Sequence, residues 1–203
     1  MRAAAGTIHV VDDDDAMRHS LALLLGALGH RIEEYHGAAR LLADVERLTG
    51  CVVADVRMPH VDGLEMLDRM RAAGSTVPVV MMTGHGDIPT AVRAMKLGAS
   101  DFLEKPFTTP LLLGAVDAAL GGGNAAGMRH EADAAFAAQV EGLTGRERDV
   151  FEHVLLGRTN KEIGLLLDIS HRTVEIHRAK VMTKTGCSCV QSLVRKSAKA
   201  GLL

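Results

Sequence analysis

The chain has 203 residues, of which 47% are hydrophobic, 24% are charged and only 2% are aromatic. That length suits one large domain or two small ones, and the composition is typical of a globular rather than a disordered protein. The first six residues are too short for a signal peptide, and no run of about 18 apolar residues is available to span a membrane. The three cysteines form no zinc pattern, so we expect reduced thiols and a cytoplasmic location.

Charge is distributed unevenly along the chain. Residues 1–120 carry 11 basic and 16 acidic side chains, a net charge of −5, whereas residues 142–203 carry 11 and 6, a net charge of +5. A basic segment joined to an acidic one suggests that only the C-terminal part meets a polyanion such as nucleic acid. Random scatter of charge is the alternative, and the asymmetry alone does not decide between them.

The first 120 residues alternate predicted strands with predicted helices. Short apolar or β-prone runs predict strands at Ile8–Val11, Arg31–Tyr35, Cys51–Ala54, Val77–Met82 and Asp101–Glu104. Apolar residues at helical spacing predict helices at Ala16–Leu28, Ala39–Leu48, Gly63–Ala72, Pro89–Leu97 and Pro110–Leu120. Five such repeats predict a doubly wound parallel sheet, whose functional site lies outside the carboxyl ends of the strands.

The strand and helix alternation ends at a run of three glycines, Gly121–Gly123. Consecutive glycines do not continue a helix cheaply, so they begin a linker. The Ala-rich residues 125–139 form either a short helix or a mobile segment. We therefore divide the chain into a domain at 1–120, a linker at 121–140 and a second domain at 141–203.

The C-terminal domain is predicted to hold four helices. Thr144 and Glu147 form a capping box that starts the first helix, which Gly157 ends. A second helix covers about 160–167, and Ser170 is the expected N-cap of a third that ends near Gly186. The fourth covers about 190–200, and no strand is expected in this part.

Acidic, hydroxyl and basic residues follow different predicted strands of the N-terminal domain. Asp12–Asp15 follow the first strand, Asp55 ends the third, Thr83 ends the fourth and Lys105 follows the fifth. Carboxylates gathered at one sheet edge repel one another without a cation, and a few hard oxygen ligands suit Mg²⁺. Each of these residues, taken alone, is also explained by an ordinary structural role, such as a position in a solvated loop or at a helix cap. Taken together they predict a phosphoryl-transfer site with a nucleophile, a metal and charge-neutralising donors.

The order of the motifs VVDDDD, VVADVRMPHVDG, MMTGHGDIPTAV and DFLEKPF resembles the receiver domains of two-component response regulators. The resemblance covers residues 7–120, and TGHGDIPTAVRAMKLGASDFLEKPF is similar to the FixJ branch of that family. It implies a flavodoxin-like five-stranded fold in which Asp55 accepts a phosphoryl group from a sensor histidine kinase. It also implies that Mg²⁺ is held by Asp12, Asp13, Asp55 and the backbone carbonyl of Arg57.

The same resemblance gives roles to the neighbouring residues. Thr83 and Lys105 would contact the phosphoryl oxygens, and Phe102 would be an aromatic switch that turns inward when Thr83 moves. The Lys105–Pro106 bond matches one that is cis in the family. We interpret Asp14 and Asp15 as charges at a helix N-terminus and not as metal ligands.

The C-terminal part resembles the LuxR-type helix-turn-helix domain of the NarL-like and FixJ regulators. The motifs LTGRERDVFEHVLLGRTNKEIGLLLDIS and HRTVEIHRAKVMTKTG carry this resemblance over about residues 142–200. The expected apolar seam between its central helices is Ile163, Leu166, Leu167, Ile169 and Val174. Gly164, where the family more often has alanine, is small at the close approach of those helices.

The third helix of this domain is the expected reader of the major groove of double-stranded DNA. The candidate DNA contacts are Lys161, Arg172, Thr173, Glu175, Ile176, His177, Arg178, Lys180 and Lys184. His177 either lies near DNA or is a packed surface residue. Glu175 either accepts from cytosine N4 or orients a neighbouring arginine. A helical protein–protein module is the alternative to DNA binding.

The resemblance implies that phosphorylation repacks one face of the receiver, where Ile88, Val92 and Met95 would support a homodimer. Release of the DNA-binding domain from an inhibitory dock is the alternative switch. The expected function is a phosphorylation-dependent, DNA-binding transcription regulator that acts at promoters with RNA polymerase, with activation favoured over repression. The signal, the kinase and the target genes are not specified by the sequence.

Three rival functions were weighed against this interpretation. A phosphoaspartate phosphatase would need a second carboxylate just after Asp55, where Val56 and Arg57 stand. A phosphate-sink receiver would need no DNA-binding domain, and phosphate-independent regulation would not need the full set of acids, threonine and lysine. We therefore expect no enzyme with an external substrate. Cys187 and Cys189 are too close in sequence to pair well.

Overall fold

The computed structural model describes residues 6–84, 88–121 and 125–202, with side chains from residue 133 onward in the last range. Residues 85–87 of the longest motif and residues 122–124 of the predicted linker lie outside the described residues. The chain forms two compact units, one from residues 1–86 and 97–126 and the other from residues 87–96 and 127–203.

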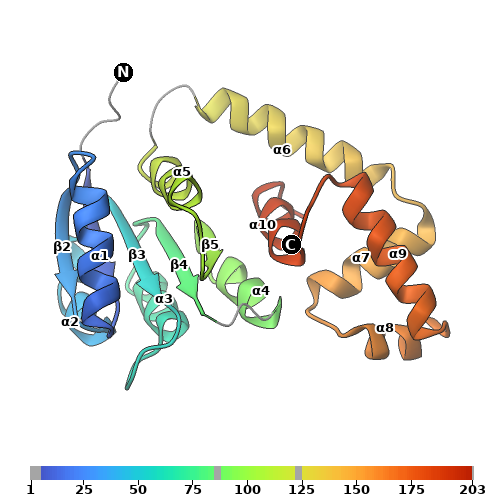
Figure 1. Cartoon of the computed structure of the whole chain (residues 1–203), viewed down its shortest axis with the longest axis horizontal. Coiled ribbons are helices and arrows are strands. Elements are labelled where there is room, and N and C mark those ends of the chain that lie inside the picture. The colour runs from blue at the N-terminus through green and yellow to red at the C-terminus, as the bar shows by residue number, and fades with distance from the viewer. Residues whose placement is uncertain (1–5, 85–87, 122–124, 203) are drawn as a thin grey trace. The chain divides into compact units, whose positions relative to one another are not determined.

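The first unit contains a five-stranded parallel sheet (Figure 1). Its strands are β1 (Thr7–Val11), β2 (Arg31–Tyr35), β3 (Cys51–Asp55), β4 (Val79–Thr83) and β5 (Asp101–Glu104), in the spatial order β2-β1-β3-β4-β5. Every pair of neighbours is parallel. The predicted doubly wound, flavodoxin-like sheet is confirmed.

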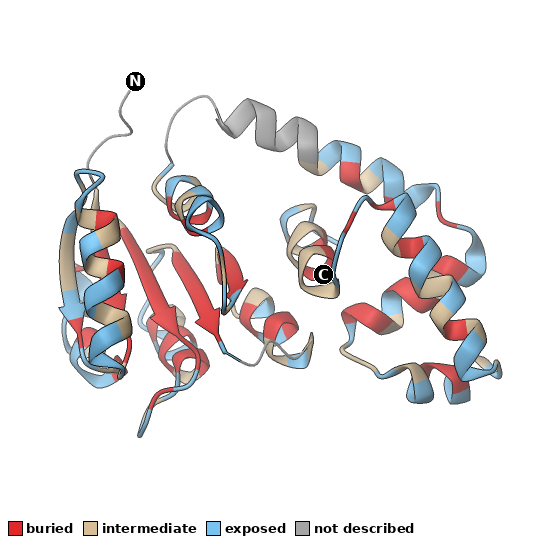
Figure 2. Cartoon of the chain, viewed as in Figure 1, coloured by how far each residue is buried: buried red, intermediate tan, exposed pale blue. Residues whose placement is uncertain are grey.

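Helices cover both faces of this sheet (Figure 1). They are α1 (Asp15–Gly26), α2 (Ala38–Ala43), α3 (Gly63–Ala72) and α5 (Thr109–Ala119). One core joins α1 and α5 to inward side chains of the strands, among them Val10, Val53 and Val80. The central strands β3 and β4 are buried at every residue, as their continuous red colour shows (Figure 2). Buried strands of this kind read as unbroken apolar runs, which is why the sequence pattern located them.

Most element boundaries differ from the prediction by one or two residues, and two differences have a visible physical reason. The fourth strand begins at Val79 rather than Val77. Pro78 has no N–H to donate to the hydrogen bonds between strands. Its carbonyl does accept from Val52 N at 2.9 Å. The expected helix Ala39–Leu48 stops at Ala43 and is followed by a 3₁₀ turn at Val45–Arg47. Asp44 N donates to Leu41 O at 3.0 Å, an i to i−3 bond that tightens the chain out of the α-helix.

The described residues of the second unit form helices joined by turns, with no strand. It contains α4 (Ile88–Lys96), α6 (Ala125–Glu141), α7 (Gly145–Leu155), α8 (Asn160–Leu167), α9 (His171–Lys184) and α10 (Val190–Lys199). The Ala-rich segment for which a helix or a mobile chain was expected is therefore the helix α6. Phe136 and Val140 near its end are buried, and Arg148 of α7 donates to the Val140 carbonyl at 3.0 Å.

The predicted helix ends of this unit are present. Thr144 and Glu147 form a reciprocal capping box, and Thr159 and Glu162 form a second one at the start of α8. Ser170 caps α9 by accepting from Thr173 N. Such caps satisfy backbone N–H groups that the first turn of a helix leaves without partners.

The predicted seam between α8 and α9 is wrong at one position. Ile163 and Val174 are buried and Leu167 is partly buried, but Leu166 is 56% exposed. At roughly 100° per residue, Gly164 and Leu167 fall on one side of Ile163 and Leu166 on the other. A Cβ at Gly164 would lie 2.8 Å from the carbonyl oxygen of Ile169, so the turn approaches α8 more closely than an alanine allows.

Among the described residues, none of the helices combines the length and the apolar character needed to cross a membrane.

Candidate functional site

Asp12, Asp55 and Lys105 meet at the carboxyl edge of the sheet. Asp12 follows β1, Asp55 ends β3 and Lys105 follows β5. The Lys105 ammonium lies 2.5 Å from Asp55 Oδ1 and 3.1 Å from Asp12 Oδ2. Both carboxylates are buried, so one cation bridges two acids from distant parts of the chain.

Burial and charge act in opposite directions on these groups. Burial raises the pKa of Asp55, and the hydrogen bond from Lys105 only partly offsets that effect. Burial alone would lower the pKa of Lys105, but its hydrogen bonds to Asp55 and Asp12 outweigh burial and raise it. Lys105 therefore stays charged between the two acids.

The backbone after β3 fixes the orientation of the Asp55 carboxylate. Arg57 N donates to Asp55 Oδ2 at 2.6 Å, which leaves Oδ1 turned toward Lys105. Gly63, the first residue of α3, donates its N–H to the Val56 carbonyl at 2.8 Å. A Cβ at Gly63 would lie only 2.2 Å from the carbonyl oxygen of Asp55, so the close approach of α3 to this strand end requires glycine.

The loop after β1 is held from both sides. Asp12 Oδ1 accepts from Asp14 N at 2.9 Å, and Arg18 donates to the Asp12 carbonyl at 2.9 Å. Asp14 is the N-cap of α1, and Asp15 lies in its first turn, as interpreted from the sequence. Hydrogen bonding from Arg18 also holds the pKa of Asp15 below its ordinary value.

The residues at this edge fit a magnesium ion. Asp12 and Asp55 are close enough that a single cation, the Lys105 ammonium, already reaches both. Within the described ranges no three His, Cys, Asp or Glu side chains form a metal site by themselves. Mg²⁺ does not require such a trio, because it binds through one or two carboxylates and keeps several waters. Asp13 is partly buried beside Asp12, and the exposed Arg57 supplies a backbone carbonyl two residues after Asp55.

The remaining predicted receiver residues lie on neighbouring strands. Thr83 ends β4 and is fully buried, and Phe102 on β5 is 5% exposed. The Lys105–Pro106 peptide bond is cis, as the resemblance implied. On α4, Val92 is buried, whereas Ile88 and Met95 are partly exposed.

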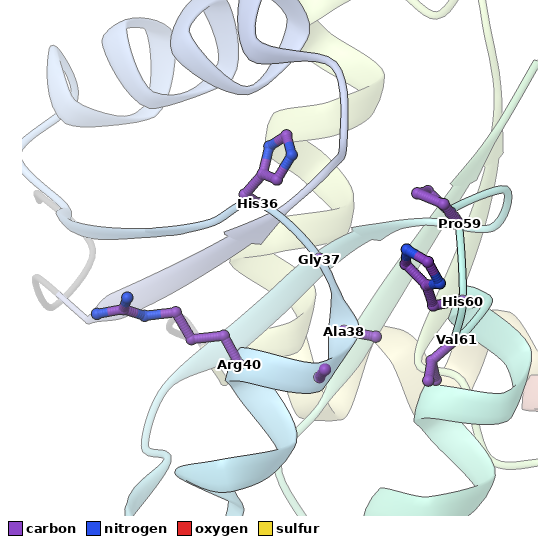
Figure 3. Close-up of a pocket in the computed structure, with 8 residues that line it drawn as sticks. His36, Gly37, Ala38, Arg40, Pro59, His60 and Val61 are labelled. Carbon is purple, nitrogen blue, oxygen red and sulfur yellow. The ribbon is translucent and has the colours of Figure 1, made fainter.

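A pocket that the sequence did not indicate lies beside the loop after β3 (Figure 3). It is lined by residues 36–40 at the start of α2 and by Pro59, His60 and Val61. His60 has a positive φ of 68°. The Arg40 side chain points away from the two histidines, so the pocket lacks a convergent set of polar groups (Figure 3).

In the second unit, α9 presents several polar side chains to solvent. Arg172 is 82% exposed and pairs with Glu175 at 3.0 Å. Ile176 and Lys180 are exposed on the same helix, and Lys161 is exposed on α8. In this structure, which holds no DNA, the Glu175 carboxylate accepts from Arg172.

Other predicted contact residues of α9 are bonded within the fold. Arg178 donates to Asn160 Oδ1 at 2.7 Å, and Lys184 lies 2.7 Å from Glu147 Oε2. The Nδ1 atom of His177 is buried with no hydrogen-bond partner among the described residues. The hydroxyl of Thr173 lies 2.8 Å from that of Ser170. Neither Asn160 nor Glu147 was among the predicted site residues.

Three cysteines remain free. Cys51 and Cys187 are buried and Cys189 is exposed. Burial raises the pKa of Cys51 to about 12, which makes it an unreactive thiol.

Two family models match the chain. Residues 8–117 match the response regulator receiver domain, and residues 141–197 match the bacterial regulatory proteins of the luxR family. Together they cover the sheet with its carboxylate edge, the helices α7 to α9 and most of α10.

Similar proteins cover nearly the full length. The transcriptional regulatory protein FixJ of Azorhizobium caulinodans is 47% identical over 196 residues, which are 96% of this chain and 93% of the relative. FixJ of Bradyrhizobium diazoefficiens is 46% identical, over 98% of this chain and 97% of the relative. A crystal structure of full-length FixJ from B. japonicum matches with a TM-score of 0.55 and 45% identity, over 98% of both chains.

Proposed function

Because the chain belongs to the response regulators that join a receiver domain to a LuxR-type DNA-binding domain, we propose that phosphorylation of Asp55 controls its binding to DNA. The family consists of FixJ-like transcription regulators and not of enzymes. A receiver domain implies a histidine kinase as partner, and a LuxR-type helix-turn-helix implies DNA.

The proposal for Asp55 rests above all on its contact with Lys105. A phosphohistidine of the kinase presents its phosphorus to Asp55, whose Oδ1 attacks in line. The new O–P bond forms as the N–P bond breaks, and the electron pair of that bond leaves with the imidazole. Lys105, already 2.5 Å from Oδ1, neutralises charge on the transferring group. Thr83 at the end of β4 contacts a phosphoryl oxygen, and Phe102 responds to its movement.

Receiver domains generally use Mg²⁺ for phosphorylation. We propose that Asp12, Asp13, Asp55 and the Arg57 carbonyl hold it here. When bound, the ion supplies positive charge that offsets the charge of the incoming phosphoryl group. Asp12 and Asp55 are suited to this role because the fold already holds them around one cation.

Labelling by acetyl phosphate with Mg²⁺ tests the assignment. Asp55→Asn should abolish labelling, because the amide is not a nucleophile of this kind. Asp14→Asn is the matched control: Asn caps a helix as well as Asp does, and the Asp14 side chain accepts from Ala16 N and Met17 N at the start of α1. Undiminished labelling of Asp55→Asn, or equal loss in both variants, would overturn the proposal.

For the second unit we propose that α9 reads the major groove. The residues that we propose either to contact DNA or to position α9 for that contact are Lys161, Arg172, Thr173, Glu175, Ile176, His177, Arg178, Lys180 and Lys184. The exposed Arg172, Lys180 and Lys161 suit contacts to phosphate. Salt-sensitive binding to a short duplex supports this interface, and absence of binding at low salt contradicts it.

Two switching mechanisms remain distinct proposals. Phosphorylation either forms a homodimer through Ile88, Val92 and Met95 or releases the DNA-binding domain from an inhibitory dock. A dimer would raise the effective concentration of α9 on neighbouring half-sites of a promoter, where activation involves RNA polymerase. Sedimentation with and without acetyl phosphate separates the mechanisms: a phosphorylated monomer that gains DNA affinity excludes dimerisation.

A further inference from the structure

Arg178 differs from the other basic residues of α9 in where its side chain lies. Its guanidinium is half-buried and donates to Asn160 Oδ1, the first residue of α8, at 2.7 Å. By contrast, Arg172 is largely exposed and Lys180 is exposed. Burial lowers the pKa of Arg178 below its ordinary value, although an arginine remains charged at neutral pH.

The position of Arg178 on the helix explains this difference. Val174 and Val181 are buried, and Arg178 lies four residues after the first and three before the second. Residues at this spacing share one helix face, so Arg178 belongs to the face of α9 that is turned toward the rest of the domain. The exposed Ile176, Ala179 and Lys180 lie off that face.

Asn160 is available to accept this bond. The backbone N–H groups at the start of α8 are capped by Thr159 and Glu162, which form a capping box without help from Asn160. Its side-chain oxygen therefore serves α9 and not its own helix. A charge-assisted hydrogen bond is about twice as strong as a neutral one, so it fixes two helices well.

We infer that Arg178 is a positioning residue for DNA recognition: by binding Asn160 it sets the angle of α9 against α8, and it does not contact phosphate or bases. This inference rests on the proposed DNA-binding function. Phosphate contacts then fall to the exposed Arg172, Lys180 and Lys161, and sequence discrimination depends on the Arg178–Asn160 pair that touches no base.

The test compares DNA affinities of the full chain, phosphorylated with acetyl phosphate and Mg²⁺. The variants are Arg178→Gln, Asn160→Ala, their combination and, as a matched control, Arg172→Gln on the exposed face. Two probes are used: a duplex selected from a random pool by the wild-type protein, and an unselected duplex of equal length. Each titration is repeated from low to moderate salt, and circular dichroism verifies that every variant is folded.

Loss of the pair should weaken binding to the selected duplex by about tenfold in either single variant. The double variant should be no worse than the singles, because both remove one bond. Binding to the unselected duplex and the slope of log K against log salt should stay unchanged. Arg172→Gln should instead lose a phosphate contact. The magnitude of the salt slope should then fall by about 0.9, and binding to both duplexes should weaken alike.

A fall of that size in the magnitude of the salt slope for Arg178→Gln would overturn the inference. Wild-type affinity of Asn160→Ala for the selected duplex would overturn it as well. Asn160→Ala decides the matter even where Arg178→Gln does not fold, since it leaves the arginine free to reach phosphate. Failure of the wild-type protein to bind any duplex would instead contradict the proposed function itself.

Discussion

The proposed phosphoacceptor site gathers its charges from three strand ends and buries them, whereas the proposed DNA-binding face takes most of its charges from the helix α9 and exposes them. Asp12, Asp55 and Lys105 come from the first, third and fifth strands, and each acid is bonded to the lysine. On α9, the exposed Arg172 pairs with its helical neighbour Glu175. Exposed pairs contribute little to stability, while a buried acid without its cation is costly. Substitutions in the first region should therefore disturb both chemistry and fold, and those on the exposed face mainly binding.

The largest expected effect comes from removing the shared cation. Lys105→Met leaves Asp12 and Asp55 without their common partner and removes a donor from the transferring group. Labelling by acetyl phosphate with Mg²⁺ should fall by about a hundredfold, the usual size for loss of a charge-stabilising donor. Lys105→Arg, which keeps the charge, should retain part of the activity. Wild-type labelling of the methionine variant would show that the buried site does not depend on this pairing.

A second effect concerns the packing that shapes the same site. Gly63→Ala would place a methyl group against the Asp55 carbonyl, so it should lower the free energy of unfolding by about 2 kcal/mol. Gly114→Ala is the matched control, since nothing lies within 4 Å of a Cβ at that exposed helical position. The control should raise stability by up to about 1 kcal/mol through helix propensity. Urea unfolding measures both, and an equal response of the two variants would contradict the close approach of α3 to the strand.

A smaller, pH-dependent effect comes from the contact between Glu147 of α7 and Lys184 of α9. Lys184 and the Thr144 backbone hydrogen-bond Glu147 and lower its pKa to about 2, from an ordinary value of 4.5. A carboxylate with a lowered pKa stabilises the folded state above its unfolded pKa, and this stability is lost as the pH falls from about 4.5 toward 2. Glu147→Gln should therefore melt a few degrees below wild type at pH 7, and the difference should shrink below pH 4.5. A difference that is constant with pH would show that Glu147 acts only as a cap.

The sequence predicted the first region more completely than the second. Asp12, Asp55 and Lys105 each follow a recognisable buried strand, and parallel topology alone brings strand ends to one edge. Asn160, the partner of Arg178, lies 18 residues away in the sequence. Which residue bonds to Arg178 depends on side-chain packing between helices, and the spacing of apolar residues does not predict such packing. The spacing of Val174, Arg178 and Val181 was nevertheless a readable sign that this arginine faces inward.

The error at Leu166 has the same cause. Leu166 was placed in the α8–α9 seam because it is apolar, yet it is exposed because the short helix buries only the arc around Ile163. The pairing of Glu147 with Lys184 joins residues 37 apart and was equally out of reach of local patterns. Positions that are fixed by the order of parallel strands were predictable from the sequence. Contacts that depend on packing between helices became visible only in the structure.

The most direct test of phosphorylation control measures DNA binding to genomic fragments by gel shift, with and without acetyl phosphate and Mg²⁺, for wild type and Asp55→Asn. We expect phosphorylation to tighten binding by the wild type and to leave the variant unaffected. Equal binding in all four conditions would contradict the receiver as the switch, even though the DNA-binding domain itself would stand.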